Sequence, residues 1–125
     1  MPLRNYRPAG LASVALTVAI LLSPLHAMAH AILVASQPQD GGSVPAGTIA
    51  FDLRYNSRID RPRSRLTLTR PDHTQVSLPI ARDGALDEVR ATASLAPGAY
   101  VLRWQVLAID GHITRGDLPF SVAGH

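Results

Sequence analysis

From residue 48 onward, hydrophobic and polar residues alternate in short runs. In the first run, residues 48–55, the apolar positions are Ile49, Phe51, Leu53 and Tyr55. Runs with the same alternation occupy residues 65–69, 75–80, 89–95, 100–108 and 118–122. A period of two predicts β-strands that bury one face and expose the other.

Turn residues separate these runs. The pairs Asp83-Gly84, Pro97-Gly98 and Asp110-Gly111 suit tight turns, because Gly accepts a positive φ and Pro fixes φ. No stretch after residue 29 has a helical period of useful length. About seven short strands joined by turns predict an all-β domain, an immunoglobulin-like Greek-key sandwich or barrel.

The first 29 residues have a different pattern. Arg4 and Arg7 precede an apolar run over residues 11–22, which Ser23 and Pro24 end. Residues 27–29, Ala-Met-Ala, then place small residues at the positions that a signal peptidase reads. This layout predicts a cleavable signal peptide over residues 1–29, because the apolar run is too short to span a bilayer comfortably.

Cleavage after Ala29 would leave one domain of residues 30–125 that begins with His30. The whole chain has 125 residues, twelve basic and nine acidic side chains, and a formal charge of +3. Two of the arginines belong to the predicted leader, so the secreted domain is almost neutral and lacks the basic footprint of a nucleic-acid-binding protein. There is no Cys, which excludes disulfides and thiolate-bound metals. Both methionines also lie in the leader, so the predicted domain contains no sulfur.

Three residues of this domain are candidate metal ligands. A terminal His30 would offer its α-amine and ring Nδ1 as a chelating pair, since an α-amine has a pKa near 8. In Asp110-Gly111-His112 the outer residues can point the same way and supply a carboxylate and an imidazole. Nitrogen and oxygen donors without sulfur favour tetragonal Cu(II). Asp-Gly is also a common turn signal, so a metal site and a plain secreted sandwich both remain open on this pattern alone.

Several segments resemble the CopC family of periplasmic copper-binding proteins. The start of the predicted domain matches through His30-Ala31 and the stretch Ser36-Gln37-Pro38-Gln39-Asp40-Gly41. The run Tyr100-Val101-Leu102-Arg103-Trp104-Gln105-Val106, followed by Asp110-Gly111-His112, matches the family's later signature. Gly116, Phe120 and Val122 match its ending.

The resemblance implies that one Cu(II) is held by the amine and ring of His30, by Asp110 and by His112. It also implies a monomeric copper carrier or buffer in copper homeostasis and resistance, with a CopD-type inner-membrane protein as recipient. Two departures are visible. Ile113 stands where the family usually has Pro, and the absence of Met from the predicted domain rules out the thioether Cu(I) site of some members.

Two other functions are compatible with parts of the sequence. A terminal His with a second His is also the copper brace of lytic polysaccharide monooxygenases, although this domain is small for a substrate platform. A metal-free sandwich acting as an assembly module is the second alternative. The distance between His30 and His112 separates that alternative from the copper site.

The remaining chemically notable residues receive structural interpretations. Alternation with Leu102 and Val106 predicts that Trp104 lies in the core. His73 is expected to be an exposed turn residue, and His125 is the last residue, so either would bind copper only weakly. The arginines at 58, 61, 63 and 65 are expected on a solvated loop and strand edge, where charge discourages strand-to-strand aggregation.

Overall fold

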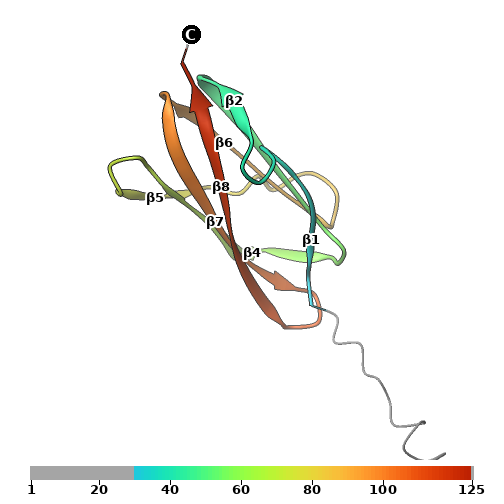
Figure 1. The fold of residues 1–125 in the computed structure, drawn as a ribbon. Helices are drawn as coiled ribbons and strands as arrows, with labels where there is room; N and C mark the ends of the chain where they lie inside the picture. The colour runs from blue at the N-terminus through green and yellow to red at the C-terminus, as the bar shows by residue number, and fades with distance from the viewer. Residues whose placement is uncertain (1–29, 125) are drawn as a thin grey trace, which may run out of the picture.

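The computed structural model describes residues 30–124, which form two packed β-sheets (Figure 1). The predicted leader, residues 1–29, and His125 lie outside the described residues. Eight strands follow in chain order: β1 Leu33–Gln37, β2 Ser43–Pro45, β3 Gly47–Tyr55, β4 Ile59–Thr69, β5 Gln75–Leu78, β6 Glu88–Leu95, β7 Gly98–Ala108 and β8 Ile113–Ala123. The predicted all-β sandwich is confirmed, with eight strands instead of about seven. Residues 30–124 contain no helix able to span a membrane.

One sheet has three strands in the order β1-β3-β6, and the other has five in the order β2-β8-β7-β4-β5. The pairs are antiparallel except for β2, which runs parallel to β8. The chain crosses between the sheets at every connection except β4 to β5 and β7 to β8. The longest ladder joins β7 and β8, whose register runs from Gly98 opposite Val122 to Leu107 opposite Ile113.

The core lies between the sheets and consists of the alternating apolar positions that the sequence pattern singles out. Phe51 of the three-stranded sheet meets Phe120 of the five-stranded sheet edge-on, with ring centroids 5.5 Å apart. Tyr55 meets Trp104 in the same way at 5.4 Å. Trp104 is buried, as predicted, and burial raises the pKa of the Tyr55 phenol.

Gly116 of β8 stands directly opposite Trp104 of β7, and the indole ring occupies the space that a side chain would need. A Cβ built on Gly116 would lie 2.6 Å from Trp104 Cε2, well inside van der Waals contact. The ring and the missing side chain are therefore complementary, and they fix how β7 and β8 pack at mid-sheet.

Two short strands and the first halves of β4 and β8 differ from the predicted elements, since β8 begins at Ile113 instead of residue 118. β1 and β2 are short and lack a clear alternation, so the pattern does not reveal them. β4 begins at Ile59 instead of residue 65. The sequence pattern did not predict its first half, because the arginines and Pro62 interrupt the alternation of apolar and polar residues there. The first half of β4 has β7 as its neighbour but lies beyond the reach of β5, so it is a strand edge as expected but not a loop.

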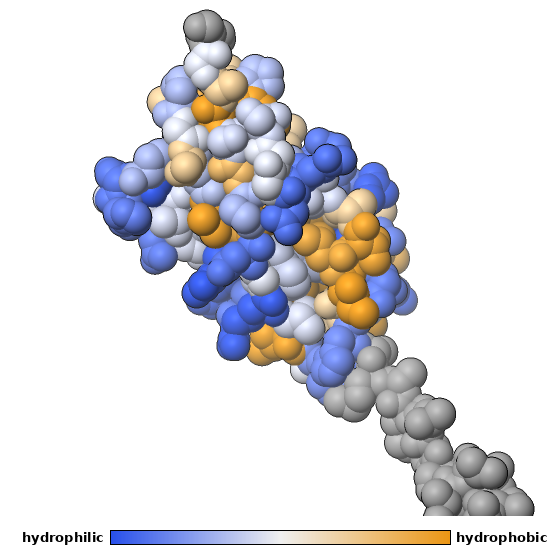
Figure 2. Space-filling model, in the orientation of Figure 1, coloured by the Kyte–Doolittle hydropathy of each residue, from blue (hydrophilic) through white to orange (hydrophobic). Residues whose placement is uncertain are grey.

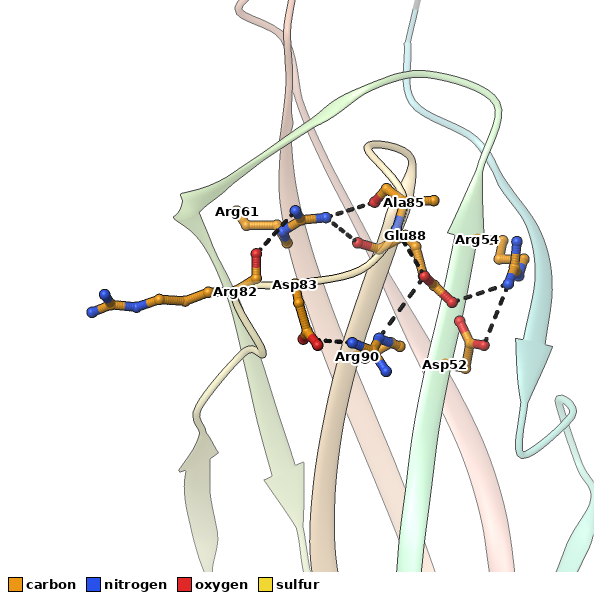
Figure 3. Close-up of polar contacts among 8 residues, drawn as sticks. All are labelled: Asp52, Arg54, Arg61, Arg82, Asp83, Ala85, Glu88 and Arg90. Carbon is orange, nitrogen blue, oxygen red and sulfur yellow. Dashed lines mark hydrogen bonds and ion pairs between the residues drawn. The ribbon is translucent and has the colours of Figure 1, made fainter.

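One arginine of that stretch is not solvated. Arg61 reaches from β4 to the segment between β5 and β6 and donates hydrogen bonds to the carbonyls of Arg82, Ala85 and Glu88 at 3.1, 2.6 and 3.0 Å (Figure 3). The expectation of a purely solvated cluster was therefore wrong for Arg61. Its guanidinium fastens residues 82–88 to the edge of the five-stranded sheet, where its planar fork suits several carbonyl acceptors.

A charged network on the three-stranded sheet holds the same segment from the other side (Figure 3). The Glu88 side chain is only 8% exposed and accepts hydrogen bonds from Arg54 Nη2 and the Ala85 N–H, each at 3.0 Å. Arg90 pairs with Asp83 and lies 3.9 Å from Glu88. The hydrogen bond from Ala85 is the main cause that lowers the pKa of Glu88 below its ordinary value of 4.5.

The fit between Gly116 and Trp104 predicts that Gly116→Ala lowers the free energy of unfolding by about 1–3 kcal/mol, since overpacking forces the indole or the strands to shift. Urea denaturation followed by circular dichroism measures the change. Gly124→Ala is the matched control, because a Cβ there would meet only Pro97 Cγ at an ordinary 3.8 Å. Equal stability of the two variants would contradict this account of the ladder.

The Glu88 network predicts a pH-dependent loss on Glu88→Gln. The pKa of Glu88 is lowered in the folded protein, so the charged carboxylate stabilises the fold above its unfolded pKa of about 4.5. That contribution disappears as the pH falls through the folded-state pKa. Thermal melts should show the variant less stable at neutral pH and the two proteins converging in acid. A difference that stays constant with pH would show that the charge of Glu88 is unimportant.

Candidate metal centre

The start of β1 and the turn between β7 and β8 meet at one end of the sandwich (Figure 1). The imidazole rings of His30 and His112 lie there with centroids 5.1 Å apart and planes at 78°. Most of the domain separates these two residues in sequence. The fold therefore brings the two predicted imidazoles together, which is the arrangement that the copper-site prediction requires.

The turn of residues 108–112 orients the His112 ring. Gly111, with φ of +94°, donates its N–H to the Ala108 carbonyl at 2.9 Å, and Ala108 donates to the His112 carbonyl at 2.9 Å. Asp110 Oδ1 accepts the His112 N–H at 3.1 Å, and Asp110 Oδ2 lies 3.1 Å from His112 Nδ1. With Nδ1 turned to the carboxylate, Nε2 is the nitrogen available to another partner.

Asp110 is held in its ionised form. The hydrogen bond from the His112 main-chain N–H is the largest influence that lowers the pKa of this carboxyl, and the His112 side chain lowers it further. An imidazole paired with a carboxylate is the arrangement that fixes the tautomer of metal-binding histidines. The pair is therefore prepared for a cation.

The His30 ring is half-buried, and its Nδ1 is buried without a hydrogen-bond partner among residues 30–124. Buried side-chain nitrogens almost always have a partner, because an unsatisfied one costs free energy. A metal ion at Nδ1 would satisfy this atom without a further protein group.

Within residues 30–124 no three His, Asp or Glu side chains are already grouped closely enough to enclose a metal ion. The arrangement is instead two neighbouring imidazoles with one carboxylate held against the second. Binding that used all three residues would need small side-chain rotations and a further donor. The main-chain nitrogen of His30 is a candidate for this further donor, because it belongs to the same residue as the His30 ring.

Two residues that the sequence did not single out fix the position of His30. The Thr114 hydroxyl donates to the carbonyl of buried Ala31 at 2.9 Å across 83 positions of sequence. Asn56 accepts the Ile32 N–H through Oδ1 at 2.7 Å and donates its own N–H to the Ile32 carbonyl at 3.0 Å. Contacts over such separations leave no local pattern, so no sequence signal could have revealed them.

The third histidine that the structure describes, His73, is not part of this arrangement. His73 is exposed in the turn between β4 and β5, as predicted, with φ of +69°. Its main-chain N–H donates to the Arg70 carbonyl, which explains its place in the turn. The expected role of His125 falls outside the described residues.

Comparison with known proteins identifies the family. The model of the CopC domain matches residues 33–123, a stretch that includes Asp110 and His112 and begins just after His30. The chain belongs to the CopC family. Copper resistance protein C of Xanthomonas campestris pv. juglandis is 29% identical over 120 residues, which cover 90% of this chain and 94% of that protein. Protein YobA of Escherichia coli K12 is 31% identical over 98 residues, covering 75% and 79%.

Solved structures of CopC proteins share the fold. The crystal structure of CopC from Methylosinus trichosporium OB3b superposes with a TM-score of 0.71 at 26% identity, covering 77% of this chain and 96% of that one. PcoC, a methionine-rich copper resistance protein from Escherichia coli, gives 0.63 at 24% identity, covering 76% and 100%, and supports the fold alone.

Family membership answers two questions that the sequence left open. CopC-family proteins are periplasmic copper-resistance proteins and not enzymes, so the prediction of a non-enzymatic protein is confirmed and the monooxygenase alternative is excluded. The chain differs from the methionine-rich PcoC in a plain chemical respect, because residues 30–125 contain no methionine.

The bond between Thr114 and Ala31 generates a prediction. Thr114→Val keeps the side-chain shape but leaves the buried Ala31 carbonyl without its donor, which should cost about 1–2 kcal/mol of stability. Hydrogen exchange at residues 31–33 should become faster, because the start of β1 loses its attachment to β8. Thr114→Ser keeps a hydroxyl and should retain slow exchange. Slow exchange in Thr114→Val would show that this bond does not fix the start of β1.

Proposed function

We propose that this protein is a periplasmic copper carrier that binds one Cu(II) at the end of the sandwich where His30 and His112 meet. The observation that carries the proposal is the contact between these two imidazoles, with a buried and unpartnered Nδ1 on His30. The copper-resistance proteins in the family support copper as the cargo.

The proposed ligands are the α-amine and Nδ1 of His30, a carboxylate oxygen of Asp110 and Nε2 of His112. The amine becomes available only if the signal peptide, residues 1–29, is removed after Ala29. In the structure both oxygens of Asp110 contact His112, so the carboxylate would have to rotate away from Nδ1 to bring an oxygen to a metal at Nε2. Three nitrogens and one oxygen suit Cu(II), and no sulfur is present to favour Cu(I).

A carrier must also release its cargo. The His112 ring and the Asp110 side chain are 44% and 30% exposed, so the proposed site lies at the surface and not in an enclosed cavity. An open site suits the transfer of copper to another protein by ligand exchange. The expected recipient is a CopD-type inner-membrane protein, and the carrier is expected to act as a monomer in copper homeostasis.

The first test is a Cu(II) titration of protein that begins at His30, followed by competition with a chelator. Binding should saturate at one equivalent. A single Gly placed before His30 converts the amine into an amide and should weaken binding by at least roughly 100-fold, since even outer partners of metal ligands contribute about 10- to 100-fold. Unchanged affinity in the extended protein would refute the terminal-amine model.

Side-chain variants separate this site from incidental binding. His112→Gln and Asp110→Asn should each weaken Cu(II) binding, whereas His73→Gln is the matched control and should bind like the unaltered protein. Circular dichroism confirms the fold of each variant. A larger effect from His73→Gln than from His112→Gln would place the copper at the other end of the domain.

A further inference from the structure

The exposed hydrophobic side chains of this domain gather at one end. Among residues 30–124, the large aliphatic side chains that are exposed are Ile32, Val34, Leu86, Ile109 and Ile113, each 53–63% accessible. Their main-chain contacts link them to the same group of turns. Ile32 bonds to Asn56, Ile59 donates to the Leu86 carbonyl, and Ile109 donates to the Arg58 carbonyl. Figure 2 shows strongly hydrophobic surface in the lower half of the molecule, toward this end.

A row of arginines lies directly behind the isoleucines on the outer face of the five-stranded sheet. Leu107 pairs with Ile113 at the end of the β7–β8 ladder, and two residues further on Arg65, Gln105 and Arg115 stand side by side on β4, β7 and β8. That step along the strands is about 7 Å. Figure 2 shows hydrophilic side chains crossing this face.

These arginines are not neutralised within the described domain. Arg58, Arg65 and Arg115 have no carboxylate partner among residues 30–124, whereas Arg54, Arg90 and Arg103 are all paired with acidic residues. Arg115 instead donates to Gln105 Oε1 at 2.8 Å, which keeps its guanidinium on the open face. Arg58, Arg65 and Arg115 thus form a cationic border without paired carboxylates, while the carboxylate at the tip itself, Asp110, is held against His112.

We propose that this end of the domain, with Ile32, Ile109 and Ile113 at its tip and Arg58, Arg65 and Arg115 behind them, docks on the surface of an anionic lipid bilayer. Aliphatic side chains that enter the interface while arginines bind phosphate headgroups are the combination that gives peripheral binding. The charge of the arginines is complementary to such a surface.

The composition and shape of the patch favour a bilayer over a protein partner. Its exposed apolar residues are aliphatic, whereas the cores of protein–protein interfaces are enriched in Tyr, Trp and Phe. Of five hollows on the described surface, one is lined by Asn56, Arg58 and Leu86, and none is lined by Ile32, Ile109 or Ile113, so these isoleucines do not wall a groove for a peptide in any of the five. If the proposed copper site is correct, docking would also bring His30 and His112 to the membrane surface.

The test measures sedimentation of metal-free protein with vesicles, so its result is independent of copper binding. Residues 30–124 contain both sheets and the whole core, so the chain that begins at His30 is the unit to use. The protein should bind vesicles of phosphatidylcholine with phosphatidylglycerol, bind phosphatidylcholine alone more weakly, and lose the difference at high salt. Absence of binding to the anionic vesicles overturns the proposal.

Two variants and their matched controls locate the surface. Ile109→Ser combined with Ile113→Ser should reduce vesicle binding by at least about tenfold, since each isoleucine loses its apolar burial. Arg65→Gln combined with Arg115→Gln should remove the preference for phosphatidylglycerol. Ala99→Ser and Arg70→Gln change exposed residues at the opposite end and should bind like the unaltered protein. Equal losses in the controls contradict the proposed location.

The absence of Cys permits a second measurement that does not depend on affinity. A polarity-sensitive dye attached to Ile109→Cys should shift to the blue on anionic vesicles, and the same dye on Ala99→Cys should not. Equal shifts at both positions overturn the proposal. Sedimentation equilibrium gives the remaining outcome. If the unaltered protein is a dimer and the double isoleucine variant is a monomer, the surface binds a second copy of the chain instead of a bilayer.

Discussion

The ladder between β7 and β8 is the constraint on which the proposed site depends. Its register places Gly116 opposite Trp104 and Ile113 opposite Leu107, so the turn that follows must contain Asp110 and His112. The same strand then supplies Thr114, whose hydroxyl holds the Ala31 carbonyl and with it the position of His30. One pair of strands therefore both builds the histidine turn and receives the start of the chain.

The alternating pattern predicted the fold because each strand of the core buries every second residue. A period of two can be recognised in a single sequence. It predicted β3, β6 and β7 well. It missed β1 and β2, which are short and mostly solvent-facing, and the first half of β4, where exposed arginines and Pro62 conceal the strand. Arg61 shows why charge alone misleads, since its guanidinium serves three carbonyls instead of water.

The candidate site could be predicted in identity but not in geometry. His30, Asp110 and His112 were recognisable from the predicted cleavage point and from the spacing of Asp110-Gly111-His112. That the rings stand 5.1 Å apart depends on Thr114 and Asn56, whose partners lie far away in sequence. The pairing of Asp110 with His112 Nδ1 depends on the shape of a turn, which a sequence pattern does not specify.

The central claim is that one Cu(II) is held between the start of the mature chain and the β7–β8 turn. The most direct measurement is anomalous diffraction at the copper edge from crystals of the Cu(II)-loaded protein that begins at His30. The account predicts a single strong peak that contacts the His30 nitrogen atoms, Asp110 and His112 Nε2. A peak at His73, or one that contacts His112 without His30, would contradict it.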